Sequence, residues 1–257
     1  MRMFIAQNKS GKIPPFANTY IEEYGGLYNW WAMDGLASDG WRVPSDAELT
    51  TLTNYINTNY NQDPDDFGVG CHLKSERTAV GDPERGISTN VHPRWDYHAD
   101  NYGRDTVKFA ALPGGRRWEY GYFATIGSNG HWWSSTEFDD TRAWYRGMYY
   151  DQGNVIRHYY FDKFYGFSAR CLRDATTNEQ DSEHEDFIAE ETIIPNEYTG
   201  HDEKTYDAVR IGDQVWITEN LKETKRMVGE DIVDIAIVTD DTTWSELETA
   251  AMCAYPK

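Results

Sequence analysis

The sequence predicts an α+β fold in which loops occupy more of the chain than helices and strands do. One segment, 46–58, has strong helical periodicity, and short aromatic-rich runs separated by glycines follow between 109 and 172. The stretch between them, about 60–105, is rich in Gly, Pro, Asp and Asn and has no sustained period, so we expect long loops there. At 257 residues, the chain can bury a real core as one large domain or two small ones.

The helix has both a start signal and an apolar stripe. Ser45 stands three residues before Glu48, which is the spacing of a capping box. Apolar residues follow at helical spacing: Leu49, Leu52, Tyr55 and Ile56.

The strands are short and are separated by turn residues. We expect them at Phe109–Leu112, Trp118–Phe123, His131–Ser134, Ala143–Tyr149, Asn154–Tyr160 and Gly166–Leu172. Asp151-Gln152-Gly153-Asn154 lies between two aromatic runs and predicts a hairpin turn, because Gly and Asn tolerate positive φ.

A break in composition divides the chain. Residues 175–199 carry eight acids and no Lys or Arg, which predicts a solvated linker. Beyond it, Ala208–Ile211 and Gln214–Thr218 flank Gly212-Asp213 and predict a second hairpin, and Trp244–Leu247 suggests the start of a short helix.

The net charge of −19 is concentrated at one end. Residues 175–257 hold 21 acids and 6 bases, a net charge of −15, so the first two-thirds are nearly balanced. A polyanion would be repelled at long range, and we expect no nucleic-acid partner. Aromatic residues form 15% of the chain, with 10 Trp and 18 Tyr, and we expect most of the Trp to fill the core.

Targeting and redox signals are weak. The N-terminal apolar run is four residues long, too short for a signal peptide, and no window suits a membrane helix, so we expect synthesis in the cytoplasm and no membrane insertion. Cys71, Cys171 and Cys253 are widely spaced, which favours three reduced, buried thiols, although one disulfide with one free thiol stays possible.

Several strings together resemble one family. They are Tyr24-Gly25-Gly26-Leu27-Tyr28-Asn29-Trp30, Gly40-Trp41-Arg42-Val43-Pro44-Ser45-Asp46-Ala47-Glu48, Leu73-Lys74-Ser75, Phe109-Ala110-Ala111-Leu112-Pro113-Gly114-Gly115-Arg116, Trp132-Trp133-Ser134-Ser135-Thr136-Glu137 and Gly166-Phe167-Ser168-Ala169-Arg170-Cys171-Leu172-Arg173-Asp174. In this order the chain resembles the Fibrobacter succinogenes major paralogous (FISUMP) domain over most of 20–174. The resemblance implies a C-type-lectin-like module with a short twisted antiparallel sheet, one or two helices and long loops.

The order of segments departs from the family's pattern. FISUMP domains usually open with a segment like Val209–Leu221, followed by one like Thr243–Leu247 and then Cys253-Ala254-Tyr255, whereas here that opening comes last. We therefore divide the chain into a main body, 1–174, the linker, 175–199, and a displaced opening segment, 200–257. The segment either completes its own body, as in a circular permutation, or that of a neighbouring subunit; a headless module followed by a truncated one is the alternative.

Catalytic and cofactor signatures are missing, so we expect a protein that is not an enzyme. The chain has no Walker A motif, dinucleotide fingerprint, His-Glu-x-x-His or Gly-x-Ser-x-Gly, and formylglycine-generating enzymes of the related fold need a cysteine pair where only Cys171 stands. No cofactor is expected, except that Asp63, Asp65 and Asp66 could hold a structural Ca²⁺. The position of the closing Glu of a calcium loop is Lys74.

The segment Phe138–Tyr165 is the best candidate for a binding surface. Its Tyr, Trp, Asp, Asn, Arg and His match the composition of recognition surfaces, and the resemblance to phage tropism determinants places their ligand-contacting face here. Trp144, Arg146 and Met148 should share one face of the strand and Tyr145, Gly147 and Tyr149 the other, with either face outside. The candidate ligand-binding residues are Trp144, Tyr145, Tyr149, Tyr150, Asp151, Asn154, His158, Tyr159, Tyr160, Asp162 and Tyr165.

Three functions are compatible with these features. The first is a non-enzymatic recognition module for a protein or glycan ligand, as a phage receptor-binding or decoration protein or, less in keeping with the absent signal peptide, a bacterial surface adhesin. The second is a purely structural subunit of a virion or appendage, and the third an enzyme of unknown chemistry on a related fold. A homo-oligomer, or assembly into a larger particle, is expected.

Overall fold

The computed structural model describes residues 19–60, 68–76, 92–183, 185 and 188–257. These residues form several small sheets and a few mostly short helices, so the predicted α+β class is confirmed.

The predicted helix is α2, Asp46–Tyr60. The Ser45 hydroxyl accepts from the Glu48 backbone N–H at 3.2 Å, and the Glu48 carboxylate accepts from the Ser45 backbone N–H at 2.7 Å, so the capping box is confirmed. Leu49, Leu52 and Ile56 face the core as the periodicity predicts. The short helix α3, Val69–Leu73, packs beside α2.

The central sheet has the order β4-β5-β6, with β4 at Asn129–Glu137, β5 at Ala143–Tyr149 and β6 at Ile156–His158. All pairs are antiparallel, and the predicted turn joins β5 to β6. Three of the six predicted strands therefore fall in this sheet. Strand β5 has the predicted bounds, β4 is longer than predicted and β6 is shorter.

A second sheet joins the end of the body to the displaced segment. Its order is β7-β10-β9-β8, with β7 at Leu172–Asp174, β8 at Ile193–Thr199, β9 at Thr205–Ile211 and β10 at Gln214–Ile217. The β9–β10 hairpin is confirmed, and Gly212 in its turn has a φ of +60° with Tyr55 packed against it. Strand β8 lies in the segment expected to be a linker.

The C-terminus returns to the start of the body. Strand β14, Ala251–Cys253, pairs antiparallel with β1, Leu27–Tyr28, and parallel with β13, Ala236–Ile237. Cys253 thus lies opposite Leu27 of the same chain. The remaining elements are α1 (Ile21–Tyr24), η1 (Trp30–Met33), β2 (Arg116–Arg117), β3 (Phe123–Ala124), α4 (Thr177–Gln180), β11 (Lys225–Val228), β12 (Asp231–Asp234) and α5 (Asp241–Ser245).

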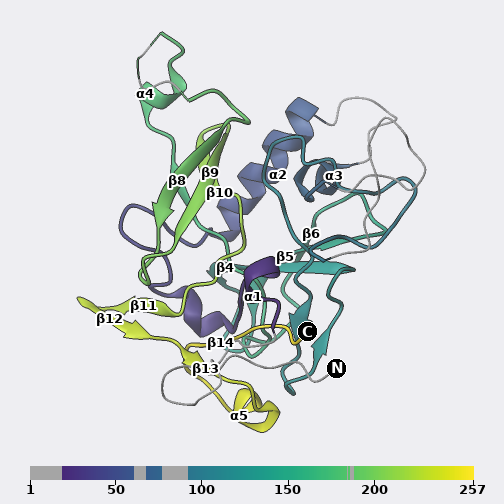
Figure 1. Cartoon of the computed structure of the whole chain (residues 1–257), viewed down its shortest axis with the longest axis vertical. Helices are drawn as coiled ribbons and strands as arrows, with labels where there is room; N and C mark the ends of the chain where they lie inside the picture. Colours follow the sequence, from purple (N-terminus) through teal and green to yellow (C-terminus); the bar gives the residue numbers. More distant parts are fainter. Residues whose placement is uncertain (1–18, 61–67, 77–91, 184, 186–187) are drawn as a thin grey trace, which may run out of the picture.

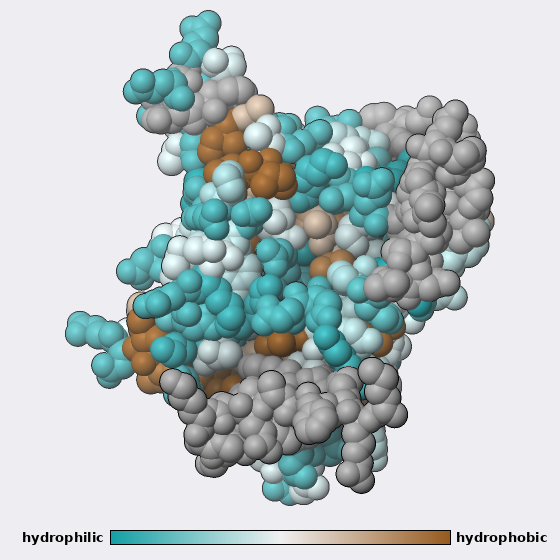
Figure 2. All heavy atoms as spheres, viewed as in Figure 1, coloured by the Kyte–Doolittle hydropathy of each residue, from teal (hydrophilic) through white to brown (hydrophobic). Residues whose placement is uncertain are grey.

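Figure 1 shows the resulting arrangement. The β4–β6 sheet occupies the middle, α2 and α3 lie above it, β8–β10 stand beside α2, and β11–β14 and α5 lie below. Figure 2 shows that this face is mainly hydrophilic with small separate apolar areas; exposed apolar residues include Ile193 in β8 and Val228 and Ile232 in the β11–β12 hairpin.

Three strand predictions are wrong or shifted. Residues 109–112 contribute one bridge, from Ala111 to Lys74, and residues 118–122 form the turn between β2 and β3. Residues 166–168 bridge in succession to Arg117, Tyr28 and Trp132. Because each residue of this segment meets a different element, no ladder can extend there, and regular pairing starts only at Leu172. Helix α5 begins three residues earlier than predicted because Asp240 caps it.

The core holds much of the tryptophan, as expected. Trp95, Trp132, Trp133, Trp216 and Trp244 are each at most 3% exposed. All three cysteines are buried and none is in a disulfide, in agreement with the prediction of three buried thiols.

A buried polar network ties the displaced segment to the body. Arg170 is 1% exposed and donates to the carbonyls of Phe109 at 2.7 Å and Ile217 at 2.8 Å, and its Nε donates to Asn220 Oδ1 at 3.1 Å. Asn220 Oδ1 also accepts from Trp132 Nε1 at 2.8 Å, and its amide nitrogen donates to the Tyr24 carbonyl at 3.0 Å. Burial lowers the pKa of Arg170 to about 9. We call these contacts the Arg170–Asn220 network.

Replacing Asn220 with alanine should destabilise the fold strongly. The change removes the shared acceptor of two buried donors, one of them charged, so the free energy of unfolding should fall by at least about 2 kcal/mol in urea titrations. Asn178→Ala, an exposed change in α4, should shift it by less than about 0.5 kcal/mol. Equal effects of the two variants would contradict the role given to the network.

Residues 1–176 expressed alone should not melt cooperatively. They would lack β9, β10 and β14, leaving β7 and β1 without their partner strands and Arg170 without two of its acceptors. Calorimetry of the fragment is expected to show no sharp transition. A soluble monomer with a sharp transition would contradict this dependence.

Candidate functional site

The tip of the β5–β6 hairpin is fixed by a buried cation. Lys74 Nζ donates to the carbonyls of Tyr149 at 2.6 Å, Gln152 at 2.7 Å and Asn101 at 3.0 Å. The side chain is fully buried, and burial lowers the pKa of Lys74 to about 8. Lys74, at the position where a calcium loop would have its closing Glu, therefore holds the turn by direct hydrogen bonds.

Both faces of β5 are covered along most of its length. Tyr145 packs into one core cluster, whereas Met148 packs into the cluster that contains Leu49 and Leu52 of α2. Arg146, on the same side as Met148, pairs with Asp46 at 2.6 Å. Because side chains from both faces of β5 pack into core clusters, neither of the two faces left open by the sequence is wholly outside.

An aromatic surface remains where the hairpin opens. Phe138 stacks on Tyr159 with ring centroids 3.8 Å apart, and Trp144 meets Tyr159 edge-on at 4.9 Å. Tyr160 packs beside Tyr159 at 5.0 Å and is 63% exposed. We define the hairpin face as these four aromatic residues together with Arg142 and Arg157.

Two arginines hold this surface in place. The Arg157 guanidinium lies 3.6 Å from the centroid of the Trp144 ring and pairs with Asp46 at 2.7 Å. Burial opposes ionisation of Asp46, but hydrogen bonds from Arg157 and Arg146 outweigh it and lower the pKa of that carboxyl. Arg142 lies 5.0 Å from the Phe138 ring and pairs with Asp139. The rings are therefore oriented before any partner arrives.

The eleven predicted ligand residues separate into three groups. Trp144, Tyr159 and Tyr160 lie on the hairpin face, with His158 beside Tyr160 and Asp162 bridged to Arg142. Those at or next to the tip are Tyr149, Tyr150, Asp151 and Asn154, of which Asp151 and Asn154 are exposed. Tyr145 and Tyr165 are 1% and 4% exposed. They are core residues and do not belong to the surface, in contrast to the prediction.

Sequence reasoning missed Phe138, Arg142 and Arg157 as members of the surface. Phe138 stands at the end of β4, and its contact with Tyr159 depends on the antiparallel pairing of β4, β5 and β6. All three lie inside the candidate segment 138–165, so the aromatic and basic composition of that segment could have identified them.

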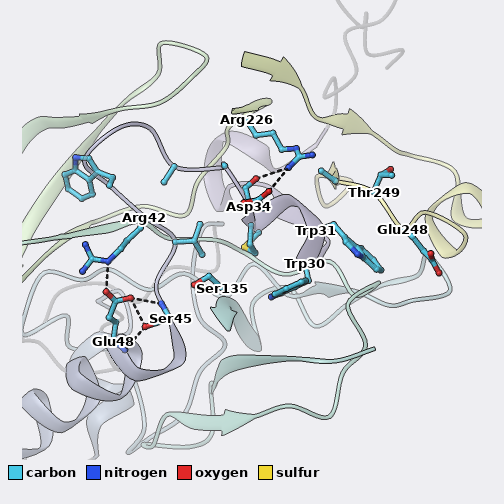
Figure 3. Close-up of a pocket in the computed structure, with 16 residues that line it drawn as sticks. Trp30, Trp31, Asp34, Arg42, Ser45, Glu48, Ser135, Arg226, Glu248 and Thr249 are labelled. Atoms are coloured by element: carbon cyan, nitrogen blue, oxygen red, sulfur yellow. Dashed lines mark hydrogen bonds and ion pairs between the residues drawn. The ribbon is translucent and has the colours of Figure 1, made fainter. Parts of the chain in front are cut away.

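A concave site elsewhere in the molecule was not predicted from the sequence. A cleft of about 980 Å³ is lined by Trp30, Trp31, Met33, Asp34, Gly35, Ala37, Trp41, Arg42, Val43, Ser45, Glu48, Ser135, Arg226, Glu248, Thr249 and Ala250. Figure 3 shows that Trp30 and Trp31 lie on one side, the Arg42–Glu48–Ser45 group on another, and Arg226 with Asp34 on a third. We call it the tryptophan cleft. Its walls come from four separate parts of the chain, so no single motif predicts it. Seven of the lining residues do lie in the strings that resemble the family: Trp30, Trp41, Arg42, Val43, Ser45, Glu48 and Ser135.

The chemistry of the described residues gives little scope for a metal. Among residues 19–60, 68–76, 92–183, 185 and 188–257, no group of three His, Cys, Asp or Glu side chains is placed to bind an ion. Asp63, Asp65 and Asp66, the predicted Ca²⁺ ligands, lie outside the described residues. Burial raises the pKa of Cys71, Cys171 and Cys253, which keeps these thiols protonated.

In the part of the chain that the structure describes, no helix is long and apolar enough to cross a membrane.

Comparison with known proteins gives one match. The model of the Fibrobacter succinogenes major domain matches residues 7–173, which include α2, the central sheet and both arginines of the hairpin face. No curated protein and no solved structure matches the chain, so the C-type-lectin-like fold stays a prediction.

Behind the hairpin face, His131 of β4 is fully buried. Its ring stacks on Phe167 at 4.9 Å, and its register partner in β5 is Gly147. Burial lowers the pKa of His131 to about 3, so the side chain is neutral in the folded protein.

Acid should therefore weaken the fold through His131. Between a pH of about 6.5 and about 3, the unfolded chain binds a proton at this site and the folded chain does not, so stability falls as pH falls, by at most about 1.4 kcal/mol per pH unit. In urea titrations, the stability difference between the wild type and His131→Met should be constant above pH 7 and shrink below pH 6. A difference that does not change with pH would contradict this.

Proposed function

The chain belongs to the Fibrobacter succinogenes major domain family, and from this premise we propose that it is a non-enzymatic recognition module that binds a protein or glycan ligand through the hairpin face. The observation that carries the proposal is the stacked, partly exposed cluster of Phe138, Trp144, Tyr159 and Tyr160, braced by Arg142 and Arg157.

The chemistry of the surface supports binding. Trp, Tyr and Arg are the residues that contribute most to protein interfaces, because each combines a large contact area with hydrogen-bonding groups. This composition favours a protein ligand over a glycan for the hairpin face.

The rigidity of the surface supports it as well. Lys74 holds the hairpin tip, and Asp46 holds Arg157 against Trp144. A partner would have to immobilise few side chains, so little of the binding energy is lost to their conformational entropy. A phage receptor-binding or decoration protein, or a bacterial surface adhesin, would use such a surface.

Removing the exposed rings should abolish recognition and leave the fold intact. We expect Trp144→Ala combined with Tyr160→Ala to reduce adsorption of the labelled protein to a panel of intact bacterial cells by at least about tenfold, as measured by flow cytometry. The melting temperature should fall by no more than a few degrees, because Tyr160 is 63% exposed and Trp144 is half-buried.

Tyr120→Ala is the matched control. Tyr120 is 64% exposed and lies in the turn between β2 and β3, so its removal should leave adsorption unchanged. Equal adsorption by the double variant and the wild type, or no adsorption of the wild type to any strain, would contradict the proposal.

A further inference from the structure

We infer that the tryptophan cleft binds a short neutral oligosaccharide, at a site separate from the hairpin face. None of the residues that line the cleft belongs to the hairpin face. The two sites can therefore gain or lose ligands independently.

The shape of the cleft suits a small extended ligand. Its volume of about 980 Å³ lies at the upper end of the range of ordinary ligand sites, so it can hold a molecule larger than one sugar ring. It lies where η1 and the loop after it, on the body, meet β11 and residues 248–250 of the displaced segment.

The indole rings at the cleft are held in fixed orientations. Trp30 Nε1 donates to the Ser134 carbonyl at 2.9 Å, and Lys163 Nζ lies 4.7 Å from the centroid of the Trp30 ring system. Trp31 packs edge-on against Phe164 at 4.8 Å. All three cleft tryptophans remain partly exposed. A fixed and partly exposed indole is a suitable platform for the C–H face of a sugar ring, because the contact is apolar and little side-chain freedom is lost.

Polar groups around these rings match the hydroxyl groups of a sugar. Carboxylates accept hydrogen bonds and guanidinium groups donate them, and the hydroxyls of Ser135 and Thr249 do both. The Asp34 side chain is 95% exposed, with its carboxylate 3.8 Å from Arg226 Nη1. This pair can receive hydroxyl groups without a change in the fold.

The charge of the cleft argues for a neutral ligand. Arg42 and Arg226 stand against Asp34, Glu48 and Glu248, so the lining is nearly balanced in a chain of net charge −19. Arg42 Nε and Glu48 are 2.5 Å apart, which neutralises that pair locally. A polyanion or polycation would find no complementary field here.

Binding can be tested with the full chain on a printed array of neutral and acidic oligosaccharides from plant, fungal and bacterial cell walls, followed by calorimetry with the best neutral binder. Trp31→Ala should weaken that binding by at least about tenfold and Asp34→Ala by at least about threefold. Because the Asp34 side chain is almost wholly exposed, Asp34→Ala should fold normally. It therefore tests binding at the cleft even if Trp31→Ala does not fold.

Trp144→Ala combined with Tyr160→Ala is the control, since it removes two rings from the hairpin face and none from the cleft. It should retain oligosaccharide binding while losing adsorption to cells, so failure of the hairpin proposal and failure of the cleft proposal give different results. Binding of acidic oligosaccharides alone, no binding of any neutral one, or unchanged affinity in the Asp34→Ala variant would overturn the inference.

Discussion

Buried cations that donate to main-chain carbonyls, among them Arg170, Lys74 and Arg117, hold this loop-rich fold together. Strands of two to nine residues leave many buried carbonyls outside any ladder, and each must find a donor. Arg170 serves segments 109–110 and 217–220, Lys74 serves the carbonyls at 101, 149 and 152, and Arg117 serves those at 121 and 238–239. Such cations replace sheet hydrogen bonds, so removing one leaves several buried acceptors without a donor at once.

These buried cations also position the residues of the hairpin face and of the tryptophan cleft. Lys74 fixes the tip of the hairpin, so that the rings at its open end keep one arrangement. Arg170 and Asn220 join the displaced segment to the body, and the tryptophan cleft has walls from both. The cleft therefore depends on the docking of residues 200–257, whereas the rings of the hairpin face belong to the body alone. Folding of residues 200–257 is therefore linked more closely to the tryptophan cleft than to the hairpin face.

Local signals predicted local structure well. The capping box of Ser45 and Glu48 predicts a helix, and the turn at Gly212 predicts a hairpin. Both signals depend on residues that are close in the sequence. Strand β8 was missed because acidic composition suggested solvation, yet the strand pairs with β9 on both sides of a register shift and buries Tyr198. The alternation of side chains along a strand places Trp144 and Arg146 on one face. It does not show that Tyr145 is buried, since burial is set by the neighbours of β5. The cleft joins distant segments, so the family strings that contain Trp30, Trp41 and Ser135 could not show that these residues line one site.

We expect the displaced segment and the body of one chain to unfold as a unit. Native-state hydrogen exchange can test it at amides that cross between them: Gly26 to the Leu221 carbonyl, Asn29 to Ala251, Ile217 to Cys171 and Leu221 to Ala169. The opening free energies at these amides should equal the global free energy of unfolding and those of the amides of β5. Exchange at the crossing amides through a much cheaper local opening, with β5 still protected, would contradict it.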